Sequence, residues 1–217
     1  MKLFLDTGSI KDIETYTAIG IVDGVTTNPS LMAKESGDSR AIIKRICEIV
    51  KGPVSAEVIA TDAPGMIREG RDLAAIDEHV VVKVPFTKDG VKACKALRGE
   101  GIAVNVTLVF SAAQALIAAK VGATFVSPFV GRLDDVATDG MDLVQQIVEI
   151  YDNFDFDTEV LVASTRSPMH IVQAARMGAD ICTCPAAVLD ALFKHPLTDI
   201  GIDRFLKDWE ESQGAKA

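Results

Sequence analysis

Short apolar runs alternate with amphipathic helical windows along the whole chain, and this alternation constrains the fold more than any other feature. Strands that are separated by single helices form βαβ units and a parallel sheet. The predicted strands are Lys2–Asp6, Gly24–Thr27, Val54–Val58, Val80–Val84, Ala103–Thr107, Phe125–Phe129, Glu159–Ala163 and Asp180–Cys184. The predicted helices are Ser9–Ile19, Ser39–Val50, Ala63–Ile76, Lys88–Arg98, Ser111–Val121, Gly140–Tyr151, Pro168–Met177 and Ala186–Lys194. Eight such units that close on themselves give an α/β fold, the (β/α)8 or TIM barrel.

One barrel domain accounts for residues 1–217. Barrels of this type take about 200–250 residues, so the loops of this chain must be lean. The hydrophobic content of 48% supports a large core. After the eighth helix, the segment Leu197–Ser212 predicts an extra C-terminal helix, whose Phe205, Leu206 and Trp209 share one apolar side. Two environments remain open for that side: the helix's own barrel or the surface of a neighbouring subunit.

The formal net charge of −9 argues against a nucleic-acid surface, which requires a basic patch. No apolar run in the sequence approaches the roughly 20 residues of a membrane span. The segment Met1–Asp6 contains no signal-peptide cleavage pattern. We therefore expect a cytoplasmic protein that binds neither nucleic acid nor a membrane.

The cysteines, histidines and adjacent carboxylates do not predict a metal site. The pair Cys182 and Cys184 has no second pair and no nearby histidine, so buried structural thiols are the expectation, as for the other two cysteines, Cys47 and Cys94. Asp134 and Asp135 lack a further carboxylate or histidine cluster. Surface or packing roles are expected for the histidines, which are His79, His170 and His195.

Lys83 is the only charged residue in the apolar run Val80–Pro85. Such a run is typical of a strand that is buried on both faces of a parallel sheet. Burying an ammonium group is costly, and loss of its proton leaves an amine that forms Schiff bases with carbonyl substrates. The alternative interpretation is a lysine near a strand end whose amine reaches water or a carboxylate.

Polar residues follow nearly every predicted strand, where the active site of a barrel of this class lies. If Lys83 holds a ketone as an iminium, Asp6 is the candidate base for carbon–carbon cleavage. Glu57 and Thr107 could hold a water that shuttles protons. Asn28 and Asn105 are expected to form hydrogen bonds either with substrate hydroxyls or with groups around Lys83.

The late strands carry a cationic, hydroxyl-bearing group of residues, formed by Arg132, Ser164 and Arg166. Arginine binds phosphate through two parallel hydrogen bonds, and the late strands are the usual phosphate region of this fold. These residues predict a phosphorylated substrate. For Arg132 the alternative is an ion pair with Asp134 or Asp135.

Six segments resemble the transaldolase family in order along nearly the whole chain: Leu5–Thr7, Gly24–Ser30, Val82–Pro85, Asn105–Phe110, Ser127–Arg132 and Ala163–Arg166. The length resembles the small subfamily, which also includes fructose-6-phosphate aldolase. The resemblance implies a (β/α)8 barrel with no metal or organic cofactor and with sugar phosphates as substrates. It also implies a homo-oligomer, a pentamer or decamer, in which the C-terminal helix reaches a neighbour.

The resemblance assigns roles to individual residues. It implies four catalytic residues, which are Lys83 for the Schiff base, Asp6 for proton transfer, and Glu57 with Thr107 for the catalytic water. It implies substrate contacts from Asn28, Asn105 and Ser127, and phosphate contacts from Arg132, Ser164 and Arg166. The aldolase relatives carry tyrosine where this chain has Phe129 and glutamine where it has Glu57, so the resemblance implies a transaldolase. An aldolase that releases free dihydroxyacetone and a non-catalytic sugar-phosphate-binding barrel remain the alternatives.

Overall fold

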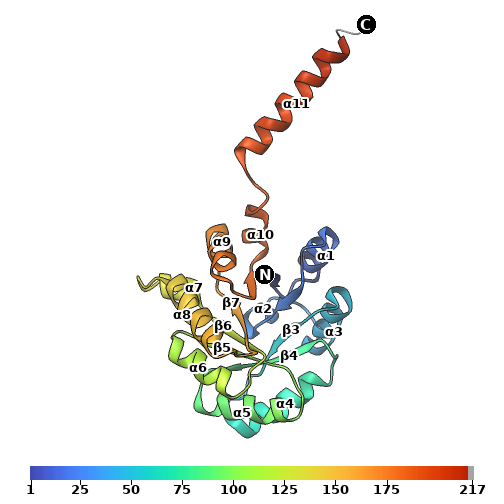
Figure 1. Ribbon diagram of the computed structural model, residues 1–217. Coiled ribbons are helices and arrows are strands. Elements are labelled where there is room, and N and C mark those ends of the chain that lie inside the picture. Colours follow the sequence, from blue (N-terminus) through green and yellow to red (C-terminus); the bar gives the residue numbers. More distant parts are fainter. Residues whose placement is uncertain (215–217) are drawn as a thin grey trace.

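Eight parallel strands close into a barrel in sequence order, and the last strand pairs with the first (Figure 1). The structure is a computed structural model that describes residues 1–214. The strands are β1 (Lys2–Asp6), β2 (Gly24–Thr26), β3 (Val54–Glu57), β4 (Val80–Pro85), β5 (Val104–Val109), β6 (Phe125–Pro128), β7 (Glu159–Val162) and β8 (Ile181–Cys184). The predicted (β/α)8 barrel is confirmed, and each predicted strand end lies within two residues of the observed end.

Helices surround the barrel and cover the outer face of the sheet (Figure 1). They are α1 (Ile10–Ile19), α3 (Ser39–Val50), α4 (Ala63–Ala74), α5 (Lys88–Gly99), α6 (Ala112–Lys120), α8 (Gly140–Asn153), α9 (Pro168–Met177) and α10 (Ala186–Ala191). Two short helices, α2 (Pro29–Met32) and α7 (Val130–Asp134), lie in the loops after β2 and β6. The sequence pattern does not predict α2 or α7, because four or five residues are too few to show a helical period.

Local sequence signals explain where most of the surrounding helices begin. In six of them the residue before the first turn accepts a backbone N–H through its side-chain oxygen; these residues are Ser9, Asp38, Asp62, Thr87, Ser111 and Asp139. Such caps satisfy N–H groups that have no partner inside the helix, and each contributes roughly 1 kcal/mol. The helices therefore start directly after the loops that follow the strands.

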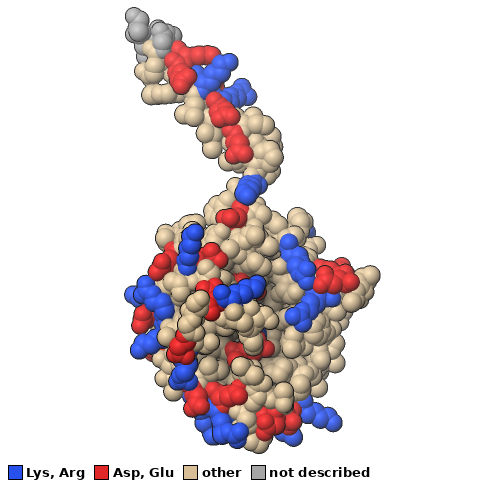
Figure 2. Space-filling model, turned by 180° about the vertical axis from the view of Figure 1, so that it is seen from behind, with Lys and Arg blue, Asp and Glu red and all other residues tan. Residues whose placement is uncertain are grey.

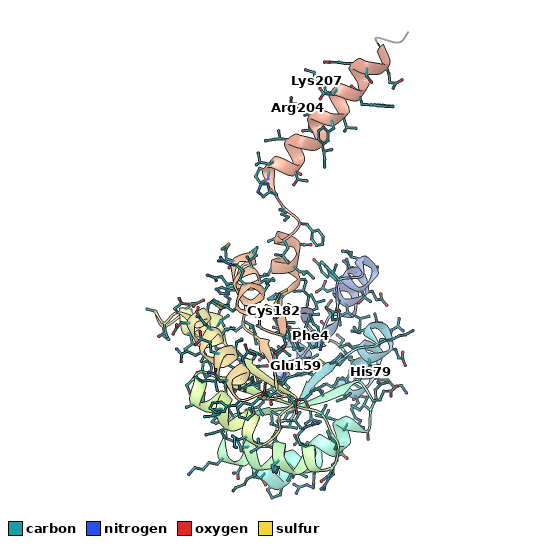
Figure 3. The ribbon with its side chains drawn as sticks, in the orientation of Figure 1. Phe4, His79, Glu159, Cys182, Arg204 and Lys207 are labelled. Atoms are coloured by element: carbon teal, nitrogen blue, oxygen red, sulfur yellow. The ribbon has the colours of Figure 1, made fainter. Side chains whose placement is uncertain are left out.

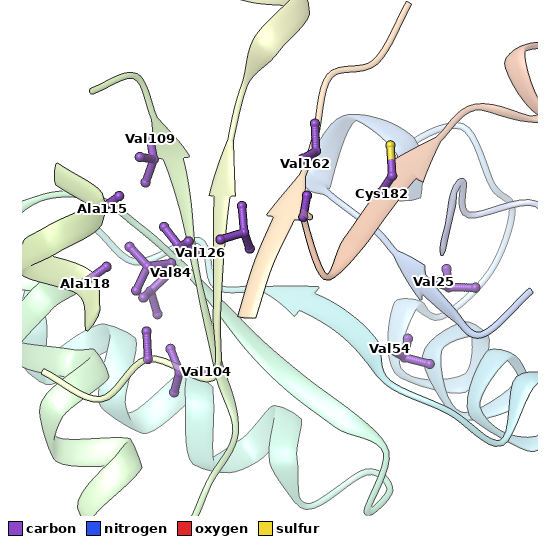
Figure 4. Packing of buried hydrophobic residues seen from close by; sticks show 14 of the residues in the cluster. Val25, Val54, Val84, Val104, Val109, Ala115, Ala118, Val126, Val162 and Cys182 are labelled. Carbon is purple, nitrogen blue, oxygen red and sulfur yellow. The ribbon is translucent and has the colours of Figure 1, made fainter. Parts of the chain in front are cut away.

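Strand β4 is buried on both faces, as the sequence predicts. Its residues Val80, Val82 and Val84 belong to the cluster between sheet and helices, where Val84 lies near Ala115 and Ala118 of α6 (Figure 4). Val81 belongs to a second cluster inside the barrel, together with Phe4, Phe125, Leu161 and Ile181. Because side chains alternate along a strand, Lys83 follows Val81 on the inner side, toward the barrel mouth.

The predicted extra C-terminal helix is confirmed as α11 (Pro196–Gly214), and it extends away from the barrel (Figure 1). Its large apolar side chains are exposed, Phe205 at 74% and Trp209 at 62%. Figure 3 shows Arg204 and Lys207 of this helix far from the labelled residues of the barrel. Of the two environments open for α11, packing against its own barrel is therefore not the one adopted.

Charged side chains of both signs are interspersed over the face of the barrel in Figure 2 and along α11. Within residues 1–214, every helix is too short or too polar to cross a membrane.

Candidate active site

The register of the strands brings polar side chains together at one end of the barrel. Glu57, Lys83 and Asn105 are partner positions on the neighbouring strands β3, β4 and β5. Asp6 and Thr26 are partner positions on β1 and β2. Partner residues on parallel strands point to the same face of the sheet. These five side chains therefore share the interior of the barrel, above the apolar cluster that contains Phe4 and Phe125.

Lys83 is buried, with 5% of its surface exposed. Its Nζ lies 3.1 Å from Oε2 of Glu57 and donates a hydrogen bond of 3.1 Å to the main-chain oxygen of Thr27. This contact agrees with the interpretation that the lysine reaches a carboxylate. Lys83 also lines a cavity at the barrel mouth, so the amine is accessible to a small molecule as well as paired.

The cavity at the mouth has a volume of about 130 Å³. Seven of the predicted site residues line it: Asp6, Asn28, Lys83, Ser127, Phe129, Arg132 and Ser164. Glu57 instead lines an adjoining groove of about 520 Å³, which also touches Asn28. Asn105, Thr107 and Arg166 are not among the residues that line the cavity. The barrel thus gathers most of the predicted site at one place.

Asp6 is held by a chain of two threonine hydroxyls. Its Oδ1 accepts a hydrogen bond of 2.7 Å from Thr26, whose oxygen lies 2.7 Å from the hydroxyl of Thr183. Burial raises the pKa of Asp6, and the Thr26 hydrogen bond and the positive charge of Lys83 oppose this rise. A carboxylate with a raised pKa accepts a proton more readily than an ordinary aspartate. The geometry therefore provides a base beside Lys83.

Sequence reasoning did not select Thr26 and Thr183, although both line the cavity. Threonine is common in strands for reasons of shape alone, so its place in the runs Gly24–Thr27 and Asp180–Cys184 gives no distinct signal. Ser55 was also missed, and it is fully buried.

Asn105 is fixed by neighbours on both sides. Its Oδ1 accepts a hydrogen bond of 2.8 Å from the hydroxyl of Ser127, and its Nδ2 donates one of 3.1 Å to Ser55. All three residues are 1% exposed or less. These two hydroxyls together engage both polar atoms of the amide, so the side chain of Asn105 is fixed in the wall of the barrel.

Thr107 lies beside an irregularity in β5. The pairing of β5 with β6 shifts register between Val106 and Val109, and Leu108 has a positive φ of 59°. A bulge of this kind re-aims side chains and often lies next to an active site. Within residues 1–214 the buried hydroxyl of Thr107 has no hydrogen-bond partner. A buried hydroxyl without a partner is costly, which makes Thr107 a suitable holder for a water molecule.

The late strands carry the two arginines. The guanidinium of Arg132 lies 5.1 Å from the centre of the Phe129 ring, in cation–π contact. Within residues 1–214, Arg132 forms no ion pair with Asp134 or Asp135, so that alternative for Arg132 is wrong. It is Arg166 that pairs with Asp135, at 2.7 Å, and both side chains are half-exposed.

A close approach between α7 and the end of β7 shapes this side of the mouth. Gly131 donates its N–H to the main-chain oxygen of Ser164. A Cβ at Gly131 would collide with that oxygen and with the side chain of Arg166. Ser164 itself has a positive φ of 60°. A residue larger than glycine at position 131 would therefore push Arg132 and Arg166 apart.

The cysteines are buried free thiols, as expected. Burial raises the pKa of Cys184 to about 12, so its thiol remains protonated at neutral pH. Within residues 1–214, no group of three or more His, Cys, Asp or Glu side chains is arranged to hold a metal ion.

The sequence of the chain is similar to a known protein family over nearly its whole length. The family model "Transaldolase/Fructose-6-phosphate aldolase" matches residues 3–216. A probable transaldolase of Kosmotoga olearia is 59% identical over 97% of each chain. Probable transaldolases of Desulfosudis oleivorans and Methanococcus maripaludis are 58% and 59% identical; these alignments cover 98% and 97% of this chain and 100% and 98% of theirs.

A solved structure, the thiamine phosphate pyrophosphorylase from Pyrococcus furiosus, is similar with a TM-score of 0.60 over 86% of each chain. At 14% identity this likeness concerns the barrel fold alone. The family match and the alignments with the relatives span nearly the whole chain. This chain therefore belongs to the transaldolase/fructose-6-phosphate aldolase family.

Proposed function

We propose that the protein is a transaldolase. It moves a dihydroxyacetone unit from sedoheptulose 7-phosphate to glyceraldehyde 3-phosphate and yields erythrose 4-phosphate and fructose 6-phosphate. One observation carries the proposal: a buried lysine, Lys83, lines the mouth cavity together with Asp6 and is paired with Glu57. A sugar-phosphate-binding protein without catalysis has no need of a buried nucleophile beside a base.

The first half of the reaction forms the Schiff base. The unprotonated amine of Lys83 attacks the ketone carbon and gives a carbinolamine. Glu57, at 3.1 Å from Nζ, takes the proton that the amine releases and passes it through a water to the departing hydroxyl. Thr107 holds that water with its otherwise unsatisfied hydroxyl. The protonated hydroxyl of the carbinolamine then leaves as a second water molecule, and an iminium remains on Lys83.

The second half breaks and remakes a carbon–carbon bond. Asp6 takes the proton of the hydroxyl on the carbon that becomes the aldehyde. The bond between that carbon and the dihydroxyacetone unit breaks, and its electrons flow into the iminium. An aldehyde leaves, and the dihydroxyacetone unit stays on Lys83 as an enamine. The enamine attacks the acceptor aldehyde, Asp6 returns its proton, and hydrolysis frees the product. Hydroxyls of the substrate are held by Asn28 and Ser127, which line the cavity, and Asn105 holds the Ser127 hydroxyl from behind.

The phosphate of either sugar lies at the late strands. Ser164 and Arg132 line the cavity, and Arg166 follows two residues after Ser164 and pairs with Asp135. Bidentate hydrogen bonds from guanidinium groups suit a phosphate dianion. In an acidic chain with a net charge of −9, two arginines at the mouth supply the local positive charge that the substrate requires. The chemistry needs no metal or organic cofactor.

Phe129 lies in the cavity and favours transfer over release. Release of free dihydroxyacetone needs a proton donor near the enamine carbon, and phenylalanine has no proton to give. Phe129→Tyr is expected to raise the release of dihydroxyacetone from fructose 6-phosphate and to lower transfer. The measurement is free dihydroxyacetone formed without an acceptor aldehyde, compared with sugar transferred when glyceraldehyde 3-phosphate is present.

Phe110→Tyr is the matched control, because Phe110 packs edge-on against Phe129 at 5.9 Å and is not among the residues that line the cavity. If the native protein releases dihydroxyacetone as fast as it transfers it, the transaldolase assignment is wrong and the fructose-6-phosphate aldolase replaces it.

We also propose that the protein is a homo-oligomer, a pentamer or decamer, in which α11 packs on a neighbouring subunit. The exposed side chains of Phe205, Leu206 and Trp209 lie on one side of a helix that its own barrel leaves uncovered. Contiguous exposed apolar side chains of this size mark protein interfaces. Their burial between subunits would remove the largest apolar side chains of α11 from water.

Deletion of the residues after Leu197 is expected to lower the oligomer size. The physical reason is the loss of the apolar side of α11, and light scattering measures the resulting molar mass. Trp209→Glu is expected to act in the same direction, whereas Lys207→Gln on the opposite side of α11 leaves the mass unchanged. A truncated protein that keeps the full mass would show that α11 does not join subunits.

A further inference from the structure

The segment Ser164–Arg166, which carries two of the proposed phosphate-binding residues, is held by a histidine. The main-chain N–H of Arg166 donates a hydrogen bond of 3.2 Å to Nδ1 of His170. The other ring nitrogen of His170, Nε2, lies 3.1 Å from Oδ2 of Asp134. The side chain of His170 is 14% exposed and that of Asp134 is 37% exposed, so the ring is largely covered while the two ends of the bridge reach the surface.

The bridge lies directly before the first turn of α9. Ser167 precedes the first turn of α9, yet its side chain makes no capping hydrogen bond. In a capping box, the side chain three residues after the cap residue reaches back to the main-chain N–H of the cap residue itself. His170 is three residues after Ser167, but it reaches one residue further back, to the N–H of Arg166. The first turn of α9 is thus tied to the main chain of Arg166, the proposed phosphate-binding arginine.

The partners of His170 assign its tautomer. Nδ1 accepts from an N–H, so it carries no proton, and Nε2–H is left to donate to the Asp134 carboxylate. The hydrogen bond from Nε2–H to Asp134 holds the ring in this orientation. Each of the two polar atoms of the ring therefore has one defined task.

The bridge also fixes the distance between the two arginines of the mouth. Asp134 and Arg132 belong to α7, whereas His170 belongs to α9, the helix that follows Arg166. A link from Asp134 through His170 to the main chain of Arg166 joins these two elements directly. Without it, α7 and the Ser164–Arg166 segment would be held together on this side by the Gly131–Ser164 hydrogen bond and the exposed pair of Arg166 with Asp135.

We propose that His170, oriented by Asp134, is a positioning residue that presents Ser164 and Arg166 to the phosphate group of the substrate. This inference rests on the proposed function, because it deepens the phosphate site assigned there. His170 does not touch the substrate in this scheme, since it acts through the main chain of Arg166. The proposed role of His170 therefore concerns the phosphate group and is the same for every sugar phosphate.

Three variants test the proposal in the full-length protein. His170→Phe keeps the ring but removes both polar atoms, and His170→Asn keeps an acceptor near the place of Nδ1. Asp134→Asn keeps the shape but weakens the hold on the ring. Arg166→Ala is the positive control for loss of phosphate binding, and Asp152→Asn, on an exposed carboxylate near the end of α8, is the matched negative control.

Two readouts separate positioning from general damage. Calorimetric titration with inorganic phosphate measures the phosphate site without catalysis. Borohydride trapping of dihydroxyacetone, which has no phosphate, measures Lys83 alone. We expect His170→Phe to weaken phosphate binding about tenfold and Asp134→Asn about threefold, in line with the loss of one or two hydrogen bonds. His170→Asn recovers most of the loss, and dihydroxyacetone trapping stays within about twofold of the native rate in all three variants.

The proposal is overturned if His170→Phe binds phosphate as the native protein does, or if phosphate binding and dihydroxyacetone trapping fall together. It is also overturned if the native protein binds no phosphate. A native protein that binds phosphate but traps no ketose on any lysine would contradict the Schiff-base function and leave the role of His170 at the phosphate site intact.

Discussion

Lys83→Met is expected to fold and to lose transfer activity by several orders of magnitude. Methionine is close to lysine in length and is apolar, so it suits an inner position of β4 above Val81. It has no amine, so no covalent bond to the substrate forms and the entire reaction path is removed. The assay is transfer from fructose 6-phosphate to an acceptor aldehyde, with circular dichroism as the check on folding.

Borohydride trapping locates the nucleophile in the native protein. With a ketose phosphate present, reduction is expected to fix the sugar on Lys83, and peptide mapping reads the position. Exposed lysines on α5 serve as the internal control, and an adduct on Lys88, Lys92 or Lys95 would contradict the assignment. Lys88→Met is the matched variant, which is expected to keep full activity because Lys88 lies outside the cavity.

Removal of one partner from a buried ion pair is destabilising in general, by about 3–5 kcal/mol when the other charge remains buried. Lys83→Met leaves the Glu57 carboxylate, 15% exposed, without its partner. The double variant Lys83→Met, Glu57→Gln removes both charges and is expected to be more stable than Lys83→Met alone. If the two have the same melting temperature, the Glu57 carboxylate carries no penalty when its partner is removed.

Asp6→Asn is expected to separate Schiff-base formation from bond cleavage. Asparagine cannot take the hydroxyl proton, and loss of a general base lowers a rate by about 10²–10⁴-fold. Lys83 is unchanged, so trapping with dihydroxyacetone should remain near the native rate. The measurement is the single-turnover cleavage of fructose 6-phosphate beside the trapping rate. Equal losses in both would mean that Asp6 acts in Schiff-base formation or in folding.

The raised pKa of Asp6 gives this prediction a dependence on pH. Burial, the largest cause, disfavours the ionised carboxylate in the folded protein, whereas the unfolded chain leaves Asp6 in water. The folded protein thus holds its proton to a higher pH than the unfolded chain. Stability from this group is greatest at acid pH and is lost as the pH rises through the folded pKa. At a pH above the usual range of an aspartate, Asp6 therefore lowers the free energy of unfolding relative to its value at acid pH.

Asparagine ionises in neither the folded nor the unfolded state, so the melting temperature of Asp6→Asn at pH 7 is expected to equal or exceed that of the native protein. The gain should vanish at acid pH, where Asp6 is protonated in both states. Cleavage by the native protein requires the ionised carboxylate, so its rate should begin to fall on the acid side at a higher pH than an ordinary aspartate would give. Asp152→Asn is again the control for an exposed carboxylate.

The amino-acid sequence by itself determined the barrel and most of its mouth. Alternation of apolar runs with helical windows is a local property, and eight repeats of it leave little choice of fold. The alternation of side chains along a strand puts Lys83 on the inner face two residues after Val81, so its burial and its place among polar strand ends could be predicted.

Only the tertiary structure decided which of these groups touch. The pairs Glu57–Lys83 and Asp135–Arg166 join different elements of the barrel, and the hydroxyl chain from Asp6 ends at Thr183, on the last strand. Such contacts depend on the stagger between neighbouring strands in the closed sheet. The spacing of apolar and polar residues along the chain does not specify that stagger. The bulge beside Thr107 and the bridge from His170 to Asp134 depend on it as well. The direction of α11 also depends on the tertiary structure: the helix extends away from the barrel, and within residues 1–214 its apolar side chains stay exposed.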